Sequence, residues 1–269
     1  MSVAVAPLAR TPQGDDYARF CEGIRRLTGI DLLQYKRAQM ERRIRTFAQR
    51  RGTDDLNAYL QALAGDAAER EAFLDRVTIN VSQLWRNPEQ WTALARDILP
   101  EIVRNGRVRA WSAGCSYGAE AYTLAALCLD TVAGSKPEIH GTDIDARMIA
   151  RARDGHFSAE DARSAPPELL RRWFDREADG WKAKRELASL MRFDQGDLLR
   201  MPFPAARYDL VMCRNTVIYF NEDVRDALHT RLAGAIRPGG YLLIGSTERV
   251  ADPKAGGLEL VRPFLYRKQ

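Results

Sequence analysis

Residues 107–120 read RVRAWSAGCSYGAE, and this stretch decides the fold of the larger part of the chain. It begins as a strand, turns at Gly114 and Gly118, and continues into a helical segment from Ala119 to about Val132. The two glycines allow a tight turn and a close approach of backbone to ligand, and the following helix start offers free N–H groups. This order is typical of the first unit of an open α/β sheet, which binds its ligand at the carboxyl ends of the strands.

The chain beyond this stretch continues the alternation of strands and helices. We predict strands over 137–145, 191–198, 207–215 and 241–248, helices over 146–153 and 223–236, a turn over 237–240, and two short final strands within 258–268 bent at Pro263. Such alternation favours a doubly wound, mostly parallel sheet with an antiparallel edge at its end. Residues 155–190 interrupt the rhythm with a polar stretch that holds one helix over 166–174, and we interpret them as an insertion.

The N-terminal part shows helical periodicity alone. Apolar residues spaced by three and four predict a helix from about Tyr17 to Leu27 with Gly29 as its stop. Further helices are predicted over 33–51, over 54–63 with Asp54 as N-cap, and over 67–77. We therefore divide the chain into a helical domain at 1–78, a linker with a connecting helix at 79–106, and an α/β domain at 107–269.

The composition excludes several classes of protein. The 269 residues carry 41 Lys and Arg against 36 Asp and Glu, and no apolar run approaches the ~18 residues of a membrane span. The first residues, MSVAVAPLARTPQG, lack the basic leader of a signal peptide. The four cysteines and three histidines are scattered without the spacing of a metal site. We expect a cytoplasmic protein without membrane insertion, bound metal or disulfides, and take a monomer as the default.

Polar residues recur at the predicted strand ends and outline a ligand. The glycine spacing at 114–118 differs from G-x-G-x-x-G, and Glu120 places a negative charge where a dinucleotide phosphate would lie. Glu120 alone is equally explained as a complement to the helix dipole. The second strand ends in Thr142-Asp143-Ile144-Asp145, where a carboxylate can accept both hydroxyls of a ribose, although Asp145 alternatively caps the next helix. The third and fourth ends carry Asp197-Leu198 and Arg214-Asn215, so S-adenosylmethionine fits this order better than NAD.

Six segments in order make the sequence resemble one family. They are Thr78 to Arg86 (TINVSQLWR), Ser112 to Glu120, Asp143 to Asp145, Cys213 to Phe220 (CRNTVIYF), Pro238 to Tyr241, and Gly245 to Glu248 (GSTE). Behind a helical N-terminal domain, this set resembles the CheR-type chemotaxis receptor glutamate methyltransferases over nearly the whole chain. The resemblance implies a class I S-adenosylmethionine-dependent fold, with glutamate methyl esters on receptors and S-adenosylhomocysteine as products. It also implies that the insertion is a small β-subdomain.

The resemblance also assigns the site. The family positions that contact the cofactor match Asn80, Ser82, Arg86, Glu120, Asp143, Asp197, Leu198, Arg214 and Asn215, to which the turn itself adds Gly114. Those matching Arg86 and Tyr219 lie near the transferred methyl group. Our hypothesis is that Arg86 holds the acceptor carboxylate and that Tyr219 orients the methyl group or the attacking oxygen.

Three departures stand at the glycine turn. Ala119 replaces the first of two family glutamates, Tyr117 replaces a threonine, and Ala121 replaces a proline. Ser82 stands where threonine is usual, and Leu84-Trp85 replace two phenylalanines. Tyr117 is expected to narrow the pocket and so to affect cofactor affinity.

A basic helix and the insertion bear on the partner. Seven cations crowd residues 36–51 against the single acid Glu41, and a patch this one-sided attracts acidic partners. No signature of nucleic-acid methylation follows the fourth strand, and the resemblance points to receptor cytoplasmic helices, contacted by Arg42, Arg43 and Arg45. The insertion turn, 176–180, lacks the glycines expected of a receptor-tail binder. A small-molecule methyltransferase and a non-catalytic S-adenosylmethionine-binding regulator stay open as alternatives.

Overall fold

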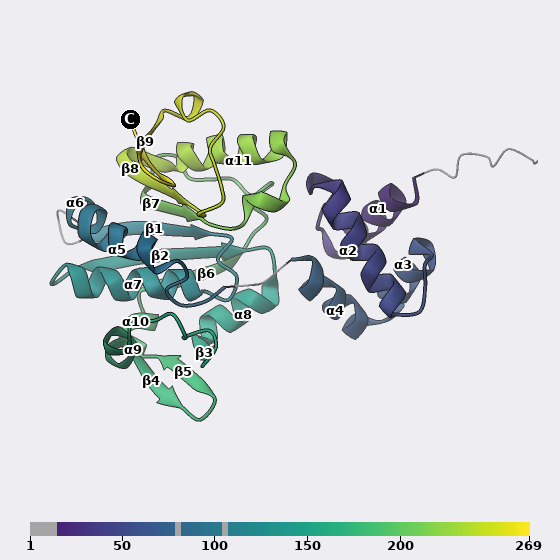
Figure 1. The fold of residues 1–269 in the computed structure, drawn as a ribbon, viewed down its shortest axis with the longest axis horizontal. Helices are drawn as coiled ribbons and strands as arrows, with labels where there is room; N and C mark the ends of the chain where they lie inside the picture. The colour runs from purple at the N-terminus through teal and green to yellow at the C-terminus, as the bar shows by residue number, and fades with distance from the viewer. Residues whose placement is uncertain (1–14, 79–81, 104–106) are drawn as a thin grey trace, which may run out of the picture. The chain divides into compact units, whose positions relative to one another are not determined.

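A computed structural model describes residues 15–78, 82–103 and 107–269, and the chain divides into two units between residues 79 and 80 (Figure 1). The regular elements of the first unit are helices and one 3₁₀ turn. It contains α1 (Asp16–Thr28), the 3₁₀ turn η1 (Leu32–Gln34), α2 (Arg37–Arg50), α3 (Leu56–Gly65) and α4 (Ala67–Val77).

Local sequence signals fix the ends of these helices. Asp15 caps α1 by accepting the Ala18 N–H, and Gly29 ends it in the left-handed region with a φ of 81°. The predicted start of the second helix is wrong, because η1 comes first and α2 begins at Arg37. The predicted N-cap Asp54 is also wrong, because the neighbouring Asp55 accepts the Asn57 N–H at 2.8 Å.

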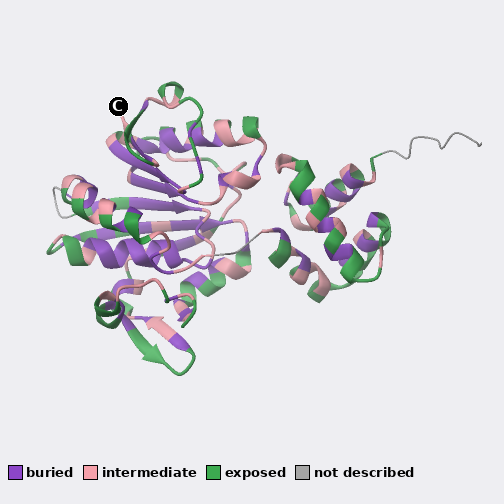
Figure 2. Cartoon of the chain, in the orientation of Figure 1, coloured by how far each residue is buried: buried purple, intermediate pink, exposed green. Residues whose placement is uncertain are grey.

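An aromatic cluster forms the core of the first unit. Phe20 from α1 stacks on Tyr59 from α3 at 6.0 Å between ring centroids, and Phe73 from α4 meets both rings edge-on. Phe47 from α2 meets Tyr59 at 6.3 Å. One buried ring from each of the four helices thus joins them, with the exposed residues on the outer faces (Figure 2).

A seven-stranded sheet forms the centre of the second unit, in the order β6-β2-β1-β7-β8-β10-β9. The first five strands of this order are parallel and β10 pairs antiparallel with β8 and β9, as the sequence predicts. The strands are β1 (Arg107–Ala113), β2 (Lys136–Asp143), β6 (Met191–Gln195), β7 (Tyr208–Cys213), β8 (Ile236–Ile244), β9 (Leu258–Arg262) and β10 (Leu265–Lys268).

Helix α7 (Ala119–Thr131) packs against β1 and β2 and is buried over most of its length (Figure 2). The π-helical η2 (Leu94–Ile98) and α6 (Leu99–Ile102) pack on it, and α5 (Pro88–Ala93) contacts η2. Farther along the chain follow α8 (Ala146–Asp154), the short turn η3 (Val217–Tyr219), α11 (Glu222–Ala235) and η4 (Lys254–Gly256). No helix in the described ranges has the length and apolarity needed to cross a bilayer.

Residues 156–188 form a separate small sheet in the order β3-β5-β4 (Figure 1). Its elements are β3 (His156–Ser158), α9 (Pro167–Trp173), β4 (Phe174–Glu177), β5 (Gly180–Ala183) and α10 (Arg185–Ala188). Phe157 and Phe174 pack on Tyr122 of α7, which attaches the small sheet to the main core.

Two sequence predictions about the main sheet need correction. The predicted turn at 237–240 lies inside β8, where the register with β7 is irregular and Gly239 has a φ of 77°. The fifth predicted strand ends at Ile244, because Gly245 to Glu248 turn back so that the Glu248 carboxylate accepts the Gly245 N–H.

Candidate functional site

The glycine turn after β1 approaches two neighbouring strand ends. Gly114 has a φ of 78°, and a Cβ there would come within 2.6 Å of Thr216 Oγ1, so only glycine fits. The N–H groups of Gly114 and Cys115 donate to the Thr142 carbonyl at 2.8 and 2.9 Å. These bonds hold the first turn against the end of β2.

Asp143 lies at the end of β2 and is almost fully buried. Its two oxygens accept the N–H groups of Ser116, at 2.8 Å, and of Asp145, at 3.0 Å. Burial nevertheless raises the pKa of this carboxyl above its ordinary value. The Ser116 hydroxyl is also buried, and the structure gives it no hydrogen-bond partner. A carboxylate beside an unpartnered hydroxyl fits a ligand that presents hydroxyl groups, such as a ribose.

The neighbouring acids have separate roles. Asp145 accepts the Arg147 N–H and caps α8, which is the structural alternative that the sequence left open. Gly196, just after β6, donates to the Asp143 carbonyl at 2.8 Å. The next two residues are the half-buried Asp197, which accepts the Leu199 N–H, and the buried Leu198. The Asp197 carboxylate and the apolar Leu198 side chain therefore come directly after the point where the ends of β2 and β6 are hydrogen-bonded.

A buried ion pair joins the start of α7 to the end of β7. Arg214 donates to Glu120 at 3.2 Å and to the Gln90 side chain at 2.9 Å, and its third nitrogen reaches the Arg86 carbonyl at 2.7 Å. Ser112, inside β1, donates to the other Glu120 oxygen at 2.7 Å. Burial, together with the nearby Arg86 charge, lowers the pKa of Arg214. Glu120 therefore has a specific partner beyond the helix dipole.

The other predicted residues of this unit include Asn215, Tyr219 and Arg86. Asn215 follows Arg214 in the left-handed region with a φ of 57°. Tyr219 ends η3 and is half-buried, and its hydroxyl has no hydrogen-bond partner among the described residues. The half-buried Arg86 contributes its carbonyl to both Arg214 and Trp91, while Asn80 lies outside the described residues.

Tyr117 connects the glycine turn to Ser82 and to the segment that follows β3 of the small sheet. Its hydroxyl binds the Ser82 carbonyl and donates to Asp161 at 2.8 Å, and the Arg151 guanidinium lies 3.8 Å from its ring centroid. Burial raises the pKa of Tyr117, so the hydroxyl keeps its proton. The structure thus gives Tyr117 a bonded position between Ser82 and the segment after β3.

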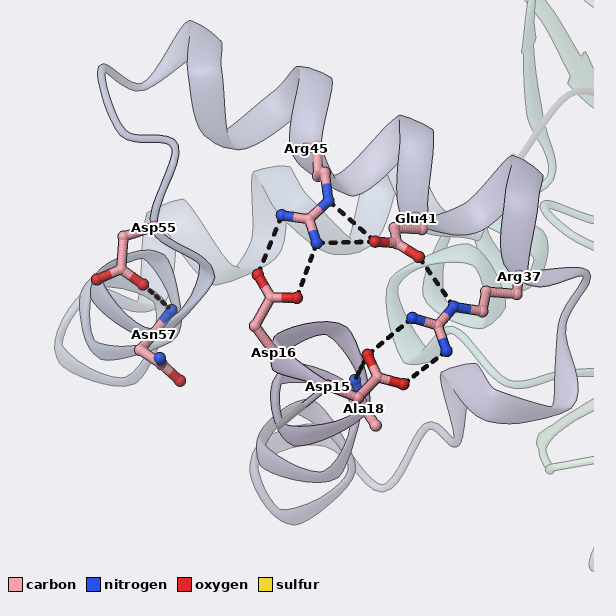
Figure 3. Close-up of polar contacts among 8 residues, drawn as sticks. All are labelled: Asp15, Asp16, Ala18, Arg37, Glu41, Arg45, Asp55 and Asn57. Atoms are coloured by element: carbon pink, nitrogen blue, oxygen red, sulfur yellow. Dashed lines mark hydrogen bonds and ion pairs between the residues drawn. The ribbon is translucent and has the colours of Figure 1, made fainter. Parts of the chain in front are cut away.

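In the first unit, the three predicted arginines of α2 differ in their contacts. Arg45 binds Asp16 of α1 and Glu41 of α2, and Arg37 joins Glu41 to Asp15 (Figure 3). Arg43 reaches the Arg76 carbonyl at 3.4 Å. Arg42 is exposed and has no ion pair within the described part of the chain. Of the three guanidinium groups, that of Arg42 is therefore the most available to a partner.

One cluster in the second unit has the composition of a cation site. His156 lies 3.1 Å from Asp179 and 3.6 Å from Glu177 on the small sheet, and both acids are exposed. A histidine between two exposed acids is sufficiently explained by ion pairing, so we assign no ligand to it.

Fold and site together define a class. A parallel sheet with an antiparallel end, a glycine turn before α7, and acidic side chains at successive strand ends make up the class I S-adenosylmethionine-dependent methyltransferase fold. A family model described as "CheR methyltransferase, SAM binding domain" matches residues 80–259, and one described as "CheR methyltransferase, all-alpha domain" matches residues 15–78. The chain belongs to the CheR methyltransferase family, and S-adenosylmethionine is its methyl donor.

Curated relatives resemble the chain over most of its length. A "Chemotaxis protein methyltransferase" of Listeria innocua is 31% identical over 94% of this chain and 97% of the relative. One of Salmonella typhimurium is 28% identical over 94% of this chain and 88% of its own length. "Chemotaxis protein methyltransferase 1" of Pseudomonas aeruginosa is 29% identical over 87% and 89%.

Sequence reasoning missed three polar residues of the site, Gln90, Ser112 and Asp161. Ser112 has a weak signal, since a hydroxyl interrupts a buried strand shortly before Glu120. Gln90 and Asp161 have none, because their partners lie 124 and 44 residues away in the chain.

Proposed function

We propose that this methyltransferase esterifies glutamate side chains in the cytoplasmic helices of chemoreceptors. The observation that carries the proposal is the presence, in one chain, of both family domains, the all-alpha domain at 15–78 and the SAM binding domain at 80–259. The named chemotaxis methyltransferases that align with over 85% of the chain support the same substrate class.

Residues of the second unit would hold the donor. Asp143 would accept the ribose hydroxyls together with the unpartnered Ser116 hydroxyl, and Asp197 with Leu198 would border the adenine. Glu120, which pairs with Arg214, would attract the donor's ammonium group through its carboxylate. Gly114, Asn215, Ser82 and Asn80 complete the proposed donor site.

Arg86 and Tyr219 would order the reacting groups. Bound S-adenosylmethionine supplies a methyl group already activated by its sulfonium, and a glutamate carboxylate is ionised near neutral pH without a general base. Alignment of the two partners is the main task left to the protein, and it can lower a barrier by about 7–11 kcal/mol. Arg86 would neutralise and hold the acceptor carboxylate, and the unpartnered Tyr219 hydroxyl would orient the attacking oxygen or the methyl group.

The exposed side of α2 would meet the receptor. Arg42 is the proposed direct contact for glutamate-rich helices, with Arg43 beside it. Arg45 would act mainly by holding α2 on α1 through Asp16 (Figure 3). The insertion turn after β4 contains only Ala178 and Asp179, and we propose that methylation does not depend on a receptor tail.

The test is transfer of labelled methyl from S-adenosylmethionine to a receptor cytoplasmic fragment, followed by mild base. Release of the label as methanol identifies a carboxyl methyl ester, and loss of the label after glutamate-to-alanine substitution in the fragment locates it. Base-stable label would contradict glutamate esterification. Equal turnover without receptor would indicate a small-molecule substrate, and cofactor binding without any transfer would indicate a regulator. Arg86→Ala and Tyr219→Phe should reduce turnover far more than cofactor affinity.

A further inference from the structure

A groove of about 900 Å³ lies at the amino ends of the parallel strands, opposite to the site described above. Its wall includes Arg107, Lys136, Met191 and Tyr208, which are the first residues of β1, β2, β6 and β7. The donor site lies at the carboxyl ends of the same strands, so the groove is a separate feature of the second unit. Small-molecule sites commonly have volumes of about 300–1,000 Å³.

The groove lies where the first halves of β1 and β2 are left partly exposed. Parallel sheets usually carry helices on both faces. Here none of residues 196–207, between β6 and β7, is helical, and the first halves of β1 and β2 alternate between exposed and buried side chains. The exposed positions hold Arg107 and Arg109 on β1, beside Lys136 and Glu138 on β2.

The charge around the groove is uncompensated. Five cations line it, Arg107, Arg109, Lys136, Arg192 and Arg207, against two acids. Both acids are already engaged, Glu138 by Arg109 at 3.1 Å and Asp194 by Arg192 at 2.7 Å. Arg107, Lys136 and Arg207 have no carboxylate within ion-pair distance in the part of the chain that the structure describes, and Arg107 and Lys136 are register partners on adjacent strands. Two such neighbouring cations suit a multiply charged anion.

Aromatic side chains line the floor between these cations. Phe203 and Tyr208 pack on the buried Trp111 at 4.7 and 5.4 Å between ring centroids, and His140 hydrogen-bonds the Tyr208 hydroxyl at 3.0 Å. Phe203 and His140 are half-buried and face the groove.

The loop of residues 196–207, which contributes to the wall of the groove, is held in place by α11. Arg231 lies 4.2 Å from the Phe203 ring and donates to the carbonyls of Leu198, Leu199 and Met201. The aromatic floor is therefore fixed before any ligand arrives.

We propose that this groove is a second ligand site that binds a nucleoside polyphosphate, with the phosphates on Arg107, Lys136 and Arg207 and the base against Phe203 and His140. A nucleotide is favoured over an acidic protein segment because it would contact both the aromatic floor and the cations of the groove. Base stacking on an aromatic side chain contributes about 1–3 kcal/mol, and the cations bind the phosphates. An acidic helix would use the cations alone.

The test is calorimetric titration of the full chain with ATP in the presence of saturating S-adenosylhomocysteine, which fills the donor site. We expect ATP to bind, with adenosine and inorganic triphosphate each at least about tenfold weaker, since each lacks one half of the contacts. Arg107→Glu with Lys136→Glu should weaken ATP binding at least about tenfold. The matched control is Arg185→Glu with Lys254→Glu, two exposed cations of the same unit outside the groove, which should change ATP binding less than about twofold at the same ionic strength.

A second variant keeps the proposal falsifiable if the double reversal impairs folding. Phe203→Leu keeps an apolar floor and should weaken ATP while leaving triphosphate binding unchanged, with thermal unfolding as the check on integrity. The proposal is overturned if ATP gives no heat at millimolar concentration, if S-adenosylhomocysteine abolishes its binding, or if triphosphate binds as tightly as ATP. Equal losses in the groove and control variants would likewise overturn it, because they would reflect net charge alone.

Discussion

Arg214 is a buried cation whose guanidinium binds Glu120, Gln90 and the Arg86 carbonyl. Removing one partner of a buried ion pair costs about 3–5 kcal/mol, because the other charge is left unpaired. We expect Arg214→Met to lower the free energy of unfolding by this amount in urea titration. Arg225→Met is the control, since Arg225 pairs with the half-buried Asp226 near the surface and should cost at most about 1 kcal/mol. A similar small loss in both variants would mean that the Glu120 contact contributes little.

Asp143 predicts a pH effect on donor binding. Burial raises its pKa, so the carboxyl becomes protonated at a higher pH than an ordinary aspartate and then accepts hydrogen bonds less well. When the pH is lowered, we expect the affinity for S-adenosylmethionine to begin to fall at a higher pH than the protonation of an ordinary aspartate would produce. In Asp143→Asn, affinity should fall about 10–100-fold and lose this pH dependence, since bonds to a charged acceptor contribute about 1.5–3 kcal/mol. Asp145→Asn preserves the α8 cap and should leave affinity near neutral pH unchanged in calorimetry, while the fall in affinity moves to lower pH, because the Asp145 charge contributes to the raised pKa of Asp143.

His229 on α11 predicts a pH effect on stability. Its ring is buried, neither nitrogen has a hydrogen-bond partner in the structure, and burial lowers its pKa to about 4. Because the unfolded chain then binds the proton more tightly, stability is fully present above about pH 6.5 and is lost as the pH falls toward 4, by up to about 3 kcal/mol. We expect His229→Leu to flatten this part of the unfolding free energy against pH. A slope unchanged in His229→Leu would contradict the assignment.

At the scale of elements, periodicity and caps predicted most helices and strands to within a few residues. Helix α4 lies where the sequence placed it, and Gly29 ends α1 because a left-handed residue is required there. The errors occur where local signals compete. Asp54 and Asp55 are both good caps, and only the backbone chooses between them. Residues 237–240 resemble a turn, although β8 runs through them and pairs with β7 on either side.

The candidate site was predictable in its strand-end residues and not in its internal bonds. Asp143, Asp197 and Arg214 lie at the carboxyl ends of predicted strands, so topology alone brings them to one edge of the sheet. The partnership of Arg214 with Gln90 depends on how residues 88–102 pack, which no local pattern encodes. The N-terminal arginines show the same limit, because charge spacing on α2 does not reveal that Arg45 is occupied by Asp16.

On helix α2, we expect Arg45 to contribute to stability and Arg42 to contribute to receptor binding. Arg45 binds Asp16 in a two-pronged contact and also Glu41, so Arg45→Ala should lower the unfolding free energy by about 1 kcal/mol, the upper range for partly exposed pairs. Arg42→Ala removes no ion pair with any residue that the structure describes, so it should leave stability unchanged while raising the KM for a receptor fragment. Thermal unfolding and methylation kinetics on the two variants measure both effects. Loss of stability in Arg42→Ala, or an unchanged KM, would contradict the division.

At the scale of the whole molecule, which has a net charge of +5, the charges differ in their exposure to solvent. The proposed donor site contains a buried ion pair and backbone hydrogen bonds to Asp143, whereas α2 presents exposed cations. Salt shortens the screening distance from about 10 Å at 0.1 M to about 3 Å at 1 M, and it acts mainly on exposed charges. Receptor recognition and donor binding should therefore respond differently to ionic strength.

We expect the KM for an acidic receptor fragment to rise about tenfold over that salt range, because steering by exposed cations is lost. The dissociation constant for S-adenosylmethionine should stay within about twofold over the same range. The measurement is methylation kinetics beside calorimetry of the donor at each salt concentration, with circular dichroism to confirm that the fragment stays helical. In Arg42→Glu with Arg43→Glu, KM should start high and lose most of its salt dependence. If the KM of the unmodified protein does not change with salt, α2 is not an electrostatic docking surface. If KM and donor affinity change in parallel, the salt-sensitive charges lie at the donor site itself.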